Sequence, residues 1–270
     1  MAEHIIQIPT KGFVEAKEFP NNEFPNHTLT ETLANCQADG RHALFMPEIV
    51  DARIALPKDS RIWQNWYSAP SVRVTGRTRQ GNAVVVYAHV PNYFSNPENI
   101  KASINQGLRN GASKIPNEEF QRLLDLEDGK SVFVVDYEVL RNASDGVIST
   151  SKALKHPQTI PFLGGQERAE AYLDKHEKVF GRQIGVWHSD DLADKPLGRL
   201  LFVGNDFDSY LYGGNLYYYG RFLGVRENVA EGGARQIKAP SLEQVLIVSD
   251  KYVPQTAKAE FEKELRKLYK

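Results

Sequence analysis

The chain has 270 residues, of which 41% are hydrophobic and 25% are charged, so it holds enough apolar side chains for one large core or two small ones. Its 33 lysines and arginines nearly balance its 34 aspartates and glutamates, so no overall electric field attracts it to nucleic acid or to an anionic membrane. The single cysteine, Cys36, excludes an intramolecular disulfide and a multi-cysteine zinc or iron–sulfur site. We expect a buried thiol there rather than a nucleophile paired with His42.

The first residues and the apolar runs indicate a cytoplasmic protein. Glu3 and His4 precede a short apolar run and Pro9, which differs from the basic and then long apolar pattern of a secretory signal. The longest apolar run, Ala83–Val90, already contains His89, whereas a membrane span needs about 20 apolar residues. A cytoplasmic location is therefore our expectation.

Several prolines interrupt residues 4 to 60 and prevent long regular elements there. In this region we expect a short helix at Thr28–Ala38. Strand-like pieces are expected at Ala43–Met46 and Ala52–Leu56.

The clearest local signal is a β-hairpin at residues 71–90. Two β-branched runs, SVRVTGRT and NAVVVYAHV, are separated by Arg79-Gln80-Gly81. Period-two alternation places Val72 and Val74 on one face of the first strand and its arginines, Arg73, Arg77 and Arg79, on the other. Because tryptophans lie just upstream, this arginine face predicts, as our third functional hypothesis, a site for single-stranded nucleic acid.

Further elements follow from capping residues and apolar spacing. Asn96-Pro97-Glu98 is typical of a helix start, and Gly111 is the expected stop. The other expected elements are helices at Asn117–Leu126, Gln166–Phe180 and Thr256–Tyr269, a strand at Ser131–Leu140, an extended segment at Gln158–Leu163, and strands at Ile184–Trp187 and Arg199–Val203.

These elements predict an α+β fold with a mixed, largely antiparallel sheet and helices packed on one side. The stretch Asn142–Thr150, rich in Asn, Ser, Asp and Gly, is the best candidate for a domain boundary. We therefore predict an N-terminal part, residues 1–145, that contains the hairpin. A C-terminal part, residues 146–270, would contain the strands of residues 184–225 and the terminal helix.

An acidic cluster follows the strand at residues 184–187. A bend there would gather one imidazole and several carboxylates, which are ligands for Mg²⁺, Mn²⁺ or Zn²⁺. The predicted ligands are His188, Asp190, Asp191, Asp206 and Asp208. A divalent metal ion is the cofactor that this hypothesis implies; the alternative is that these residues cap turns in polar loops.

An aromatic cluster comes next in the chain. Tyrosines stand on both sides of Gly213-Gly214-Asn215, which suits a hairpin turn. Tyrosine offers flat apolar area with a polar tip, which fits a sugar, a base or a partner protein. The predicted ligand-binding residues are Tyr210, Tyr212, Tyr217, Tyr219 and Arg221.

No phosphate-binding G-x-x-x-x-G-K-[ST] loop, dinucleotide-binding G-x-G-x-x-G turn or G-x-S-x-G nucleophile elbow occurs in the sequence. The leading hypothesis is an intracellular, non-catalytic binding or interaction protein that uses the tyrosine-rich hairpin. Its partner would be a small molecule or a protein rather than nucleic acid or a membrane. The alternative is a metal-dependent hydrolase acting on phosphoesters, so the sequence leaves open whether the chain is an enzyme.

Overall fold

The computed structural model describes residues 23–189, 191–205, 210–225 and 258, with the backbone alone for residues 23–26. Residues 1–227 belong to one compact unit and residues 228–270 to a second. The terminal helix expected at residues 256–269 lies outside the described residues except for Lys258, which is helical. In the part of the chain that is described, no helix has the length and apolar character needed to cross a membrane.

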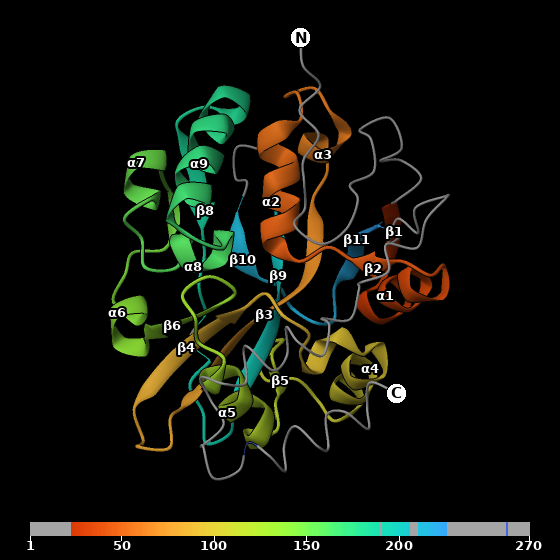
Figure 1. Cartoon of the computed structure of the whole chain (residues 1–270), viewed down its shortest axis with the longest axis vertical. Helices are drawn as coiled ribbons and strands as arrows, with labels where there is room; N and C mark the ends of the chain where they lie inside the picture. The colour runs from red at the N-terminus through yellow and green to blue at the C-terminus, as the bar shows by residue number, and fades with distance from the viewer. Residues whose placement is uncertain (1–22, 190, 206–209, 226–257, 259–270) are drawn as a thin grey trace. The chain divides into compact units, whose positions relative to one another are not determined.

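Two sheets organise the first unit (Figure 1). The larger sheet has the strand order β6-β4-β3-β9-β10-β8-β7, with β5 paired to β9, and only β10 and β8 run parallel. The smaller sheet has the order β1-β11-β2. The strands are β1 (Glu23–Thr28), β2 (His42–Ala43), β3 (Tyr67–Arg77), β4 (Ala83–Ala88), β5 (Ser113–Lys114), β6 (Val132–Asp136), β7 (Gly146–Ser149), β8 (Gln183–Val186), β9 (Leu197–Val203), β10 (Leu211–Gly213) and β11 (Tyr219–Val225).

The helices are mostly short, and several begin with a side-chain cap. Thr28 caps the first helix through a reciprocal pair with Glu31, and Asn96 caps α4 by accepting from the Glu98 N–H, as its sequence predicts. The helices are α1 (Leu29–Ala38), α2 (Met46–Ala55), α3 (Arg61–Gln64), α4 (Pro97–Asn105), α5 (Asn117–Asp125), α6 (Tyr137–Arg141), α7 (Thr150–Ala153), α8 (Thr159–Leu163) and α9 (Gln166–Phe180), with a 3-10 turn η2 (Tyr93–Ser95).

The α+β class with a mixed, largely antiparallel sheet is confirmed. The hairpin of β3 and β4 is confirmed as well, with Arg77 opposite Ala83. Strands on both sides of residue 145 share the larger sheet, since β6 belongs to the first predicted part and β8 to the second. The division into two parts at that residue stays a prediction.

Helices cover both faces of the larger sheet, whereas the sequence suggested one side. Val85 and Tyr87 of β4 point into a core cluster formed with α2, α8 and α9. Their neighbours Val84 and Val86 point into a second cluster formed with α1, α4 and α5. Each apolar side chain buried in this way contributes roughly 1.5–3 kcal/mol. The continuous run of valines in β4 thus reflects a strand that is buried on both faces.

Three segments expected to be extended are helical. Residues 52–56 were expected as a strand, but α2 reaches Ala55 because Met46, Ile49, Val50 and Arg53 are buried at helical spacing. Residues 137–140 form α6 rather than the end of a strand, because the Asp136 carboxylate accepts from the Val139 N–H and caps the helix.

Residues 159–163, expected to be extended, form α8, which ends at Gly164 with φ of +84°. A side chain at Gly164 would meet the Pro47 ring, since a Cβ there would lie 2.5 Å from Pro47 Cγ. The close approach of α8 to the start of α2 therefore depends on this glycine.

The tyrosine-rich stretch does not form the predicted hairpin. β10 pairs with β9 and β8, whereas β11 pairs with β1 and β2 in the smaller sheet. The Gly-Gly-Asn segment therefore connects two sheets instead of turning one strand back on the next. Glycines suit a hairpin turn and a connection between two sheets equally, so the local sequence could not distinguish the two.

The Cys36 thiol is buried in α1. Burial raises its pKa to about 12, so the thiolate that a nucleophile requires does not form near neutral pH. The expectation of an unreactive buried thiol is confirmed.

Histidines are buried on the α2–α9 side of the sheet. His176 packs between Tyr172 and Phe180, and neither ring nitrogen has a hydrogen-bond partner in the described part of the chain. Burial lowers the pKa of His176 from 6.5 to about 4, and it does the same for His89 and His156. Each ring is neutral in the folded chain at neutral pH and opposes folding once it must take up a proton.

This burial predicts acid sensitivity between pH 6.5 and 4. Above pH 6.5 His176 is neutral in both states; as the pH falls, the unfolded chain binds the proton first, so stability is lost. The neutral substitution His176→Phe should remove roughly 2 kcal/mol of this loss at pH 5. Thermal melts at pH 8 and pH 5 of the wild type and the variant measure it.

Replacement of the exposed His27 by Asn is the matched control, because it removes an imidazole from the surface and not from the core. If His176→Phe shifts the melting temperature equally at both pH values, its ring does not oppose folding in acid.

Candidate binding site

Period-two alternation in β9 and β10 separates a core face from an open face. Leu201, Val203 and Leu211 point into the core cluster with α2 and α9. Phe202 and Tyr212 lie opposite each other in the β9–β10 register and point the other way. Aromatic side chains therefore gather on the same face of the sheet as the second core cluster, the one formed with α1, α4 and α5.

The aromatic rings on this face form a continuous row. The Trp66 and Phe202 ring centroids are 5.3 Å apart, and Phe202 stacks on Tyr210 at 5.4 Å with an interplanar angle of 22°. Tyr210 meets Tyr212 edge to face at 6.4 Å. At the other end, the Arg221 guanidinium lies 5.5 Å from the Trp66 ring centroid. These distances are those of favourable aromatic and cation–π contacts.

A groove of about 650 Å³ runs along this row. Its aromatic lining consists of Trp66, Trp187, Phe202, Tyr210, Tyr212, Tyr218 and Tyr219. Polar groups come from Ser68, His188, Ser189 and Asn215, and Leu29 and Leu200 border the groove where the second core cluster begins. An apolar hollow with a few polar groups is the usual character of a small-molecule site.

The connection between β10 and β11 is anchored below the groove. The Leu216 N–H donates to the Gly111 carbonyl at 3.1 Å, and the Asn215 side chain accepts from the Tyr217 N–H. Gly111 has φ of +83°, and a Cβ there would lie 2.3 Å from Asn215 Cγ. The glycine thus allows the close approach that presents Tyr218 at the groove.

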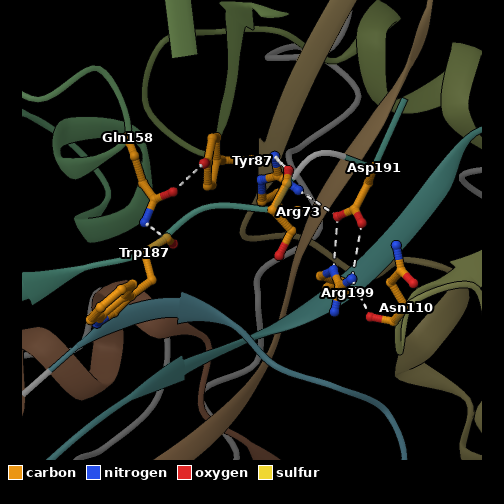
Figure 2. Close-up of polar contacts among 8 residues, drawn as sticks. Arg73, Tyr87, Asn110, Gln158, Trp187, Asp191 and Arg199 are labelled. Carbon is orange, nitrogen blue, oxygen red and sulfur yellow. Dashed lines mark hydrogen bonds and ion pairs between the residues drawn. The ribbon is translucent and has the colours of Figure 1, made fainter. Parts of the chain in front are cut away.

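A buried glutamine positions Trp187. The Gln158 amide Nε2 donates to the Trp187 carbonyl at 3.0 Å, and its Oε1 accepts from the Tyr87 hydroxyl at 3.1 Å (Figure 2). Nε2 also donates to the Leu211 carbonyl at 2.8 Å. Gln158 is fully buried. It therefore joins β8 and β10 at the one parallel pairing of the described sheet.

Two arginines clamp the segment that follows Trp187. Arg73 on β3 and Arg199 on β9 are opposite each other in the strand register, and both bind Asp191 (Figure 2). The Asp191 carboxylate accepts from Arg73 Nη1 at 2.8 Å and from Arg199 Nε and Nη2 at 2.8 and 2.9 Å. Arg73 Nη2 also donates to the Ser189 carbonyl at 2.8 Å.

The structure brings together most of the predicted tyrosine site. Tyr210, Tyr212 and Tyr219 line the groove. Tyr217 is 59% exposed and does not line it, whereas its neighbour Tyr218, 63% exposed, does. Arg221 is 9% exposed and supports Trp66 from behind rather than facing solvent.

The two predicted metal ligands that the structure describes, His188 and Asp191, have different partners. His188 Nε2 lies 3.0 Å from the Ala143 carbonyl, and its ring lines the groove. Both oxygens of the buried Asp191 are bound by arginines. Asp190, Asp206 and Asp208 lie outside the described residues. Among the described residues, no group of three or more metal-ligating side chains could hold a metal ion.

The three arginines predicted to bind nucleic acid do not form one exposed surface. Arg73 is 2% exposed, because the segment that carries Asp191 covers it, so its prediction as an outward residue is wrong. Arg77 and Arg79 are exposed at the end of the strand, and Arg79 pairs with Asp125 at 3.0 Å. The period-two alternation of β3 correctly placed the arginines on the face opposite Val72 and Val74. It could not show that the segment carrying Asp191 covers Arg73 on that face.

Comparison with known proteins gives one informative match. No family model and no curated protein matches the chain. A solved structure described as "Accommodation of massive sequence variation in Nanoarchaeota by the C-type lectin fold" is 55% identical, and the alignment covers 76% of this chain and 96% of that one with a TM-score of 0.72. The chain belongs to the C-type lectin fold family.

Four aromatic residues that line the groove of this C-type lectin fold protein were not predicted from the sequence. Trp66, Trp187 and Phe202 come from three separate segments, and Tyr218 was not among the predicted ligand-binding residues. The alternation of Phe202 between Leu201 and Val203 was a usable signal, since it marks an aromatic residue on the side away from the core.

The buried clamp predicts a strong effect of Asp191→Asn. The variant leaves two buried guanidinium groups without a carboxylate, and breaking a buried ion pair in this way costs about 3–5 kcal/mol. Urea unfolding followed by circular dichroism measures the loss.

The exposed pair Arg79–Asp125 is the matched control, with side chains 64% and 57% exposed. Asp125→Asn should change stability by at most about 1 kcal/mol. Equal effects of the two substitutions would mean that Asp191 does not hold the two strands and the groove segment together.

Proposed function

We propose that this chain is a non-catalytic binding protein whose ligand lies in the aromatic groove. The observation that carries the proposal is the row of rings from Trp66 through Phe202 and Tyr210 to Tyr212, open along one face of the sheet. Exposed aromatic surface of this extent is costly in water and is typical of a recognition site.

The groove chemistry favours a ligand with a flat apolar face and hydrogen-bonding groups. Tyrosine and tryptophan supply large contact areas at a low cost in conformational entropy. Hydroxyl, amide and imidazole groups at Tyr212, Asn215 and His188 would orient the ligand. Both a sugar ring and the side chains of a partner protein have this character, and a volume of about 650 Å³ lies in the range of small-molecule sites.

The solved relative supports a binding role. Its description states that the C-type lectin fold accommodates massive sequence variation. In this chain, groove residues and core residues alternate along the strands: Phe202 follows Leu201, and Tyr212 follows Leu211. Side chains on the open face can therefore change without altering the core that stabilises the sheet.

Two adjacent tyrosines test the proposal. Tyr218 lines the groove and Tyr217 does not, although their exposed fractions, 63% and 59%, are nearly equal. A panel of glycans and a displayed peptide library is screened with the wild type. For each ligand found, we expect Tyr218→Ala and Tyr212→Ala to cost about 2 kcal/mol or more, a loss of roughly thirtyfold, as for a central aromatic contact.

Tyr217→Ala should leave the same affinities within about twofold, since its ring does not line the groove. Ligand binding should also change tryptophan fluorescence, because Trp66 and Trp187 line the groove whereas Trp63 is buried in the core. Ligands that respond equally to all three substitutions, or to none, would place the binding surface elsewhere.

A further inference from the structure

A second, polar pocket adjoins the groove on the other side of residues 188–189. It has a volume of about 250 Å³ and lies beside β3 and α6. Its polar lining consists of Arg73, Tyr137, Arg141, Asp145, His188 and Ser189. His188 and Ser189 line both the pocket and the aromatic groove, so the short segment that carries them is a wall common to both.

Among the residues that the structure describes, the buried clamp next to this pocket carries more positive than negative charge. Arg73 and Arg199 are each 2% exposed and Asp191 is 1% exposed, so two buried guanidinium groups share one carboxylate. Burial raises the pKa of the neighbouring Tyr87, which therefore stays a neutral phenol and supplies no compensating charge. A buried charge without a counter-ion is unfavourable unless an anion reaches it.

Arg73 also has a donor to spare. The fully buried Arg53 provides a comparison within the same molecule, because Nε, Nη1 and Nη2 of Arg53 each donate to an oxygen. In Arg73, Nη1 and Nη2 are used, whereas the buried Nε has no hydrogen-bond partner among the described residues, and the same holds for Nη1 of Arg199. An arginine can therefore be buried in this fold with every nitrogen satisfied, and the arginine that lines the pocket is not.

A second cation stands at the pocket rim. Arg141 is 56% exposed, and its contact with Glu138 is long, 3.7 Å, between two exposed side chains. Such a pair is weak and leaves the guanidinium able to bind elsewhere. Asp145 is the acidic residue in the lining, so the two arginines outnumber it.

We propose that this pocket binds a small oxyanion, a carboxylate or phosphate group, between Arg73 and Arg141. Guanidinium groups match the planar and forked geometry of these anions and form strong charge-assisted hydrogen bonds with them. A volume of about 250 Å³ admits a single such group with some water, not a large ligand. The bound anion completes the charge balance of the clamp and fixes the wall that the pocket shares with the groove.

This inference does not depend on a ligand in the aromatic groove. Potassium phosphate and potassium acetate are each titrated against the full-length chain, with potassium chloride holding the ionic strength and the pH at 7. We expect at least one of the two anions to raise the melting temperature saturably, by about 2–4 °C at ten times its dissociation constant. A response to phosphate alone assigns the pocket to phosphorylated ligands, and a response to acetate assigns it to carboxylates.

Arg141→Gln should reduce this rise by at least half, whereas Arg79→Gln, which removes another exposed and paired arginine, should leave it unchanged. The side-chain Nε–H resonance of Arg73 in a nitrogen–proton correlation spectrum should move with the same saturation curve. No rise beyond that in chloride, an equal rise in Arg141→Gln, or a stationary Arg73 resonance would overturn the proposal.

Discussion

The Asp191 carboxylate, held between Arg73 and Arg199, is the interaction on which the centre of this protein depends. The two arginines face each other across β3 and β9, and like charges directly opposite in a sheet repel. Asp191 converts that repulsion into a cross-strand link and draws the segment after β8 onto the sheet. The same link places Trp187, His188 and Ser189 beside β10, where they become part of the groove.

The core residues and the groove residues lie on opposite faces of the same strands. Along β9, Leu201 and Val203 are core residues while Phe202 lines the groove. This division follows from the period-two geometry of a strand, which fixes the face of each side chain once the register is set. This separation is consistent with the description of the solved relative, in which the C-type lectin fold accommodates massive sequence variation in Nanoarchaeota.

Much of the fold could be predicted because it rests on local signals. The valine-rich hairpin of β3 and β4, the capped start of α4 and the apolar spacing of α9 all depend on neighbouring residues, and all were found. Residues 52–56 at the end of α2 were predicted as a strand although the buried residues of α2 already stand at helical spacing. The α6 and α8 segments were predicted to be extended because each has only five residues, too few for a helical pattern to show.

The site was harder to predict because it is assembled across the sheet. Tyr210, Tyr212 and Tyr219 could be proposed from aromatic density, but Trp66 and Phe202 reach the groove only through strand pairing. Arg73 looked like an exposed residue by alternation, and only the return of a distant segment shows that it is buried. The alternation of residues within one strand does not show which distant loop packs on each face of the sheet.

Gln158, at the start of α8, fixes the backbone of two strands beside the groove from the opposite side of the sheet. Its amide holds the carbonyls of Trp187 and Leu211 from the core side, 29 and 53 residues away in the chain. The shape of the groove is thus set partly by a helix whose residues do not line it. Substitutions in α8 that tilt this amide would change the shape of the groove remotely, while the aromatic lining itself stays the same.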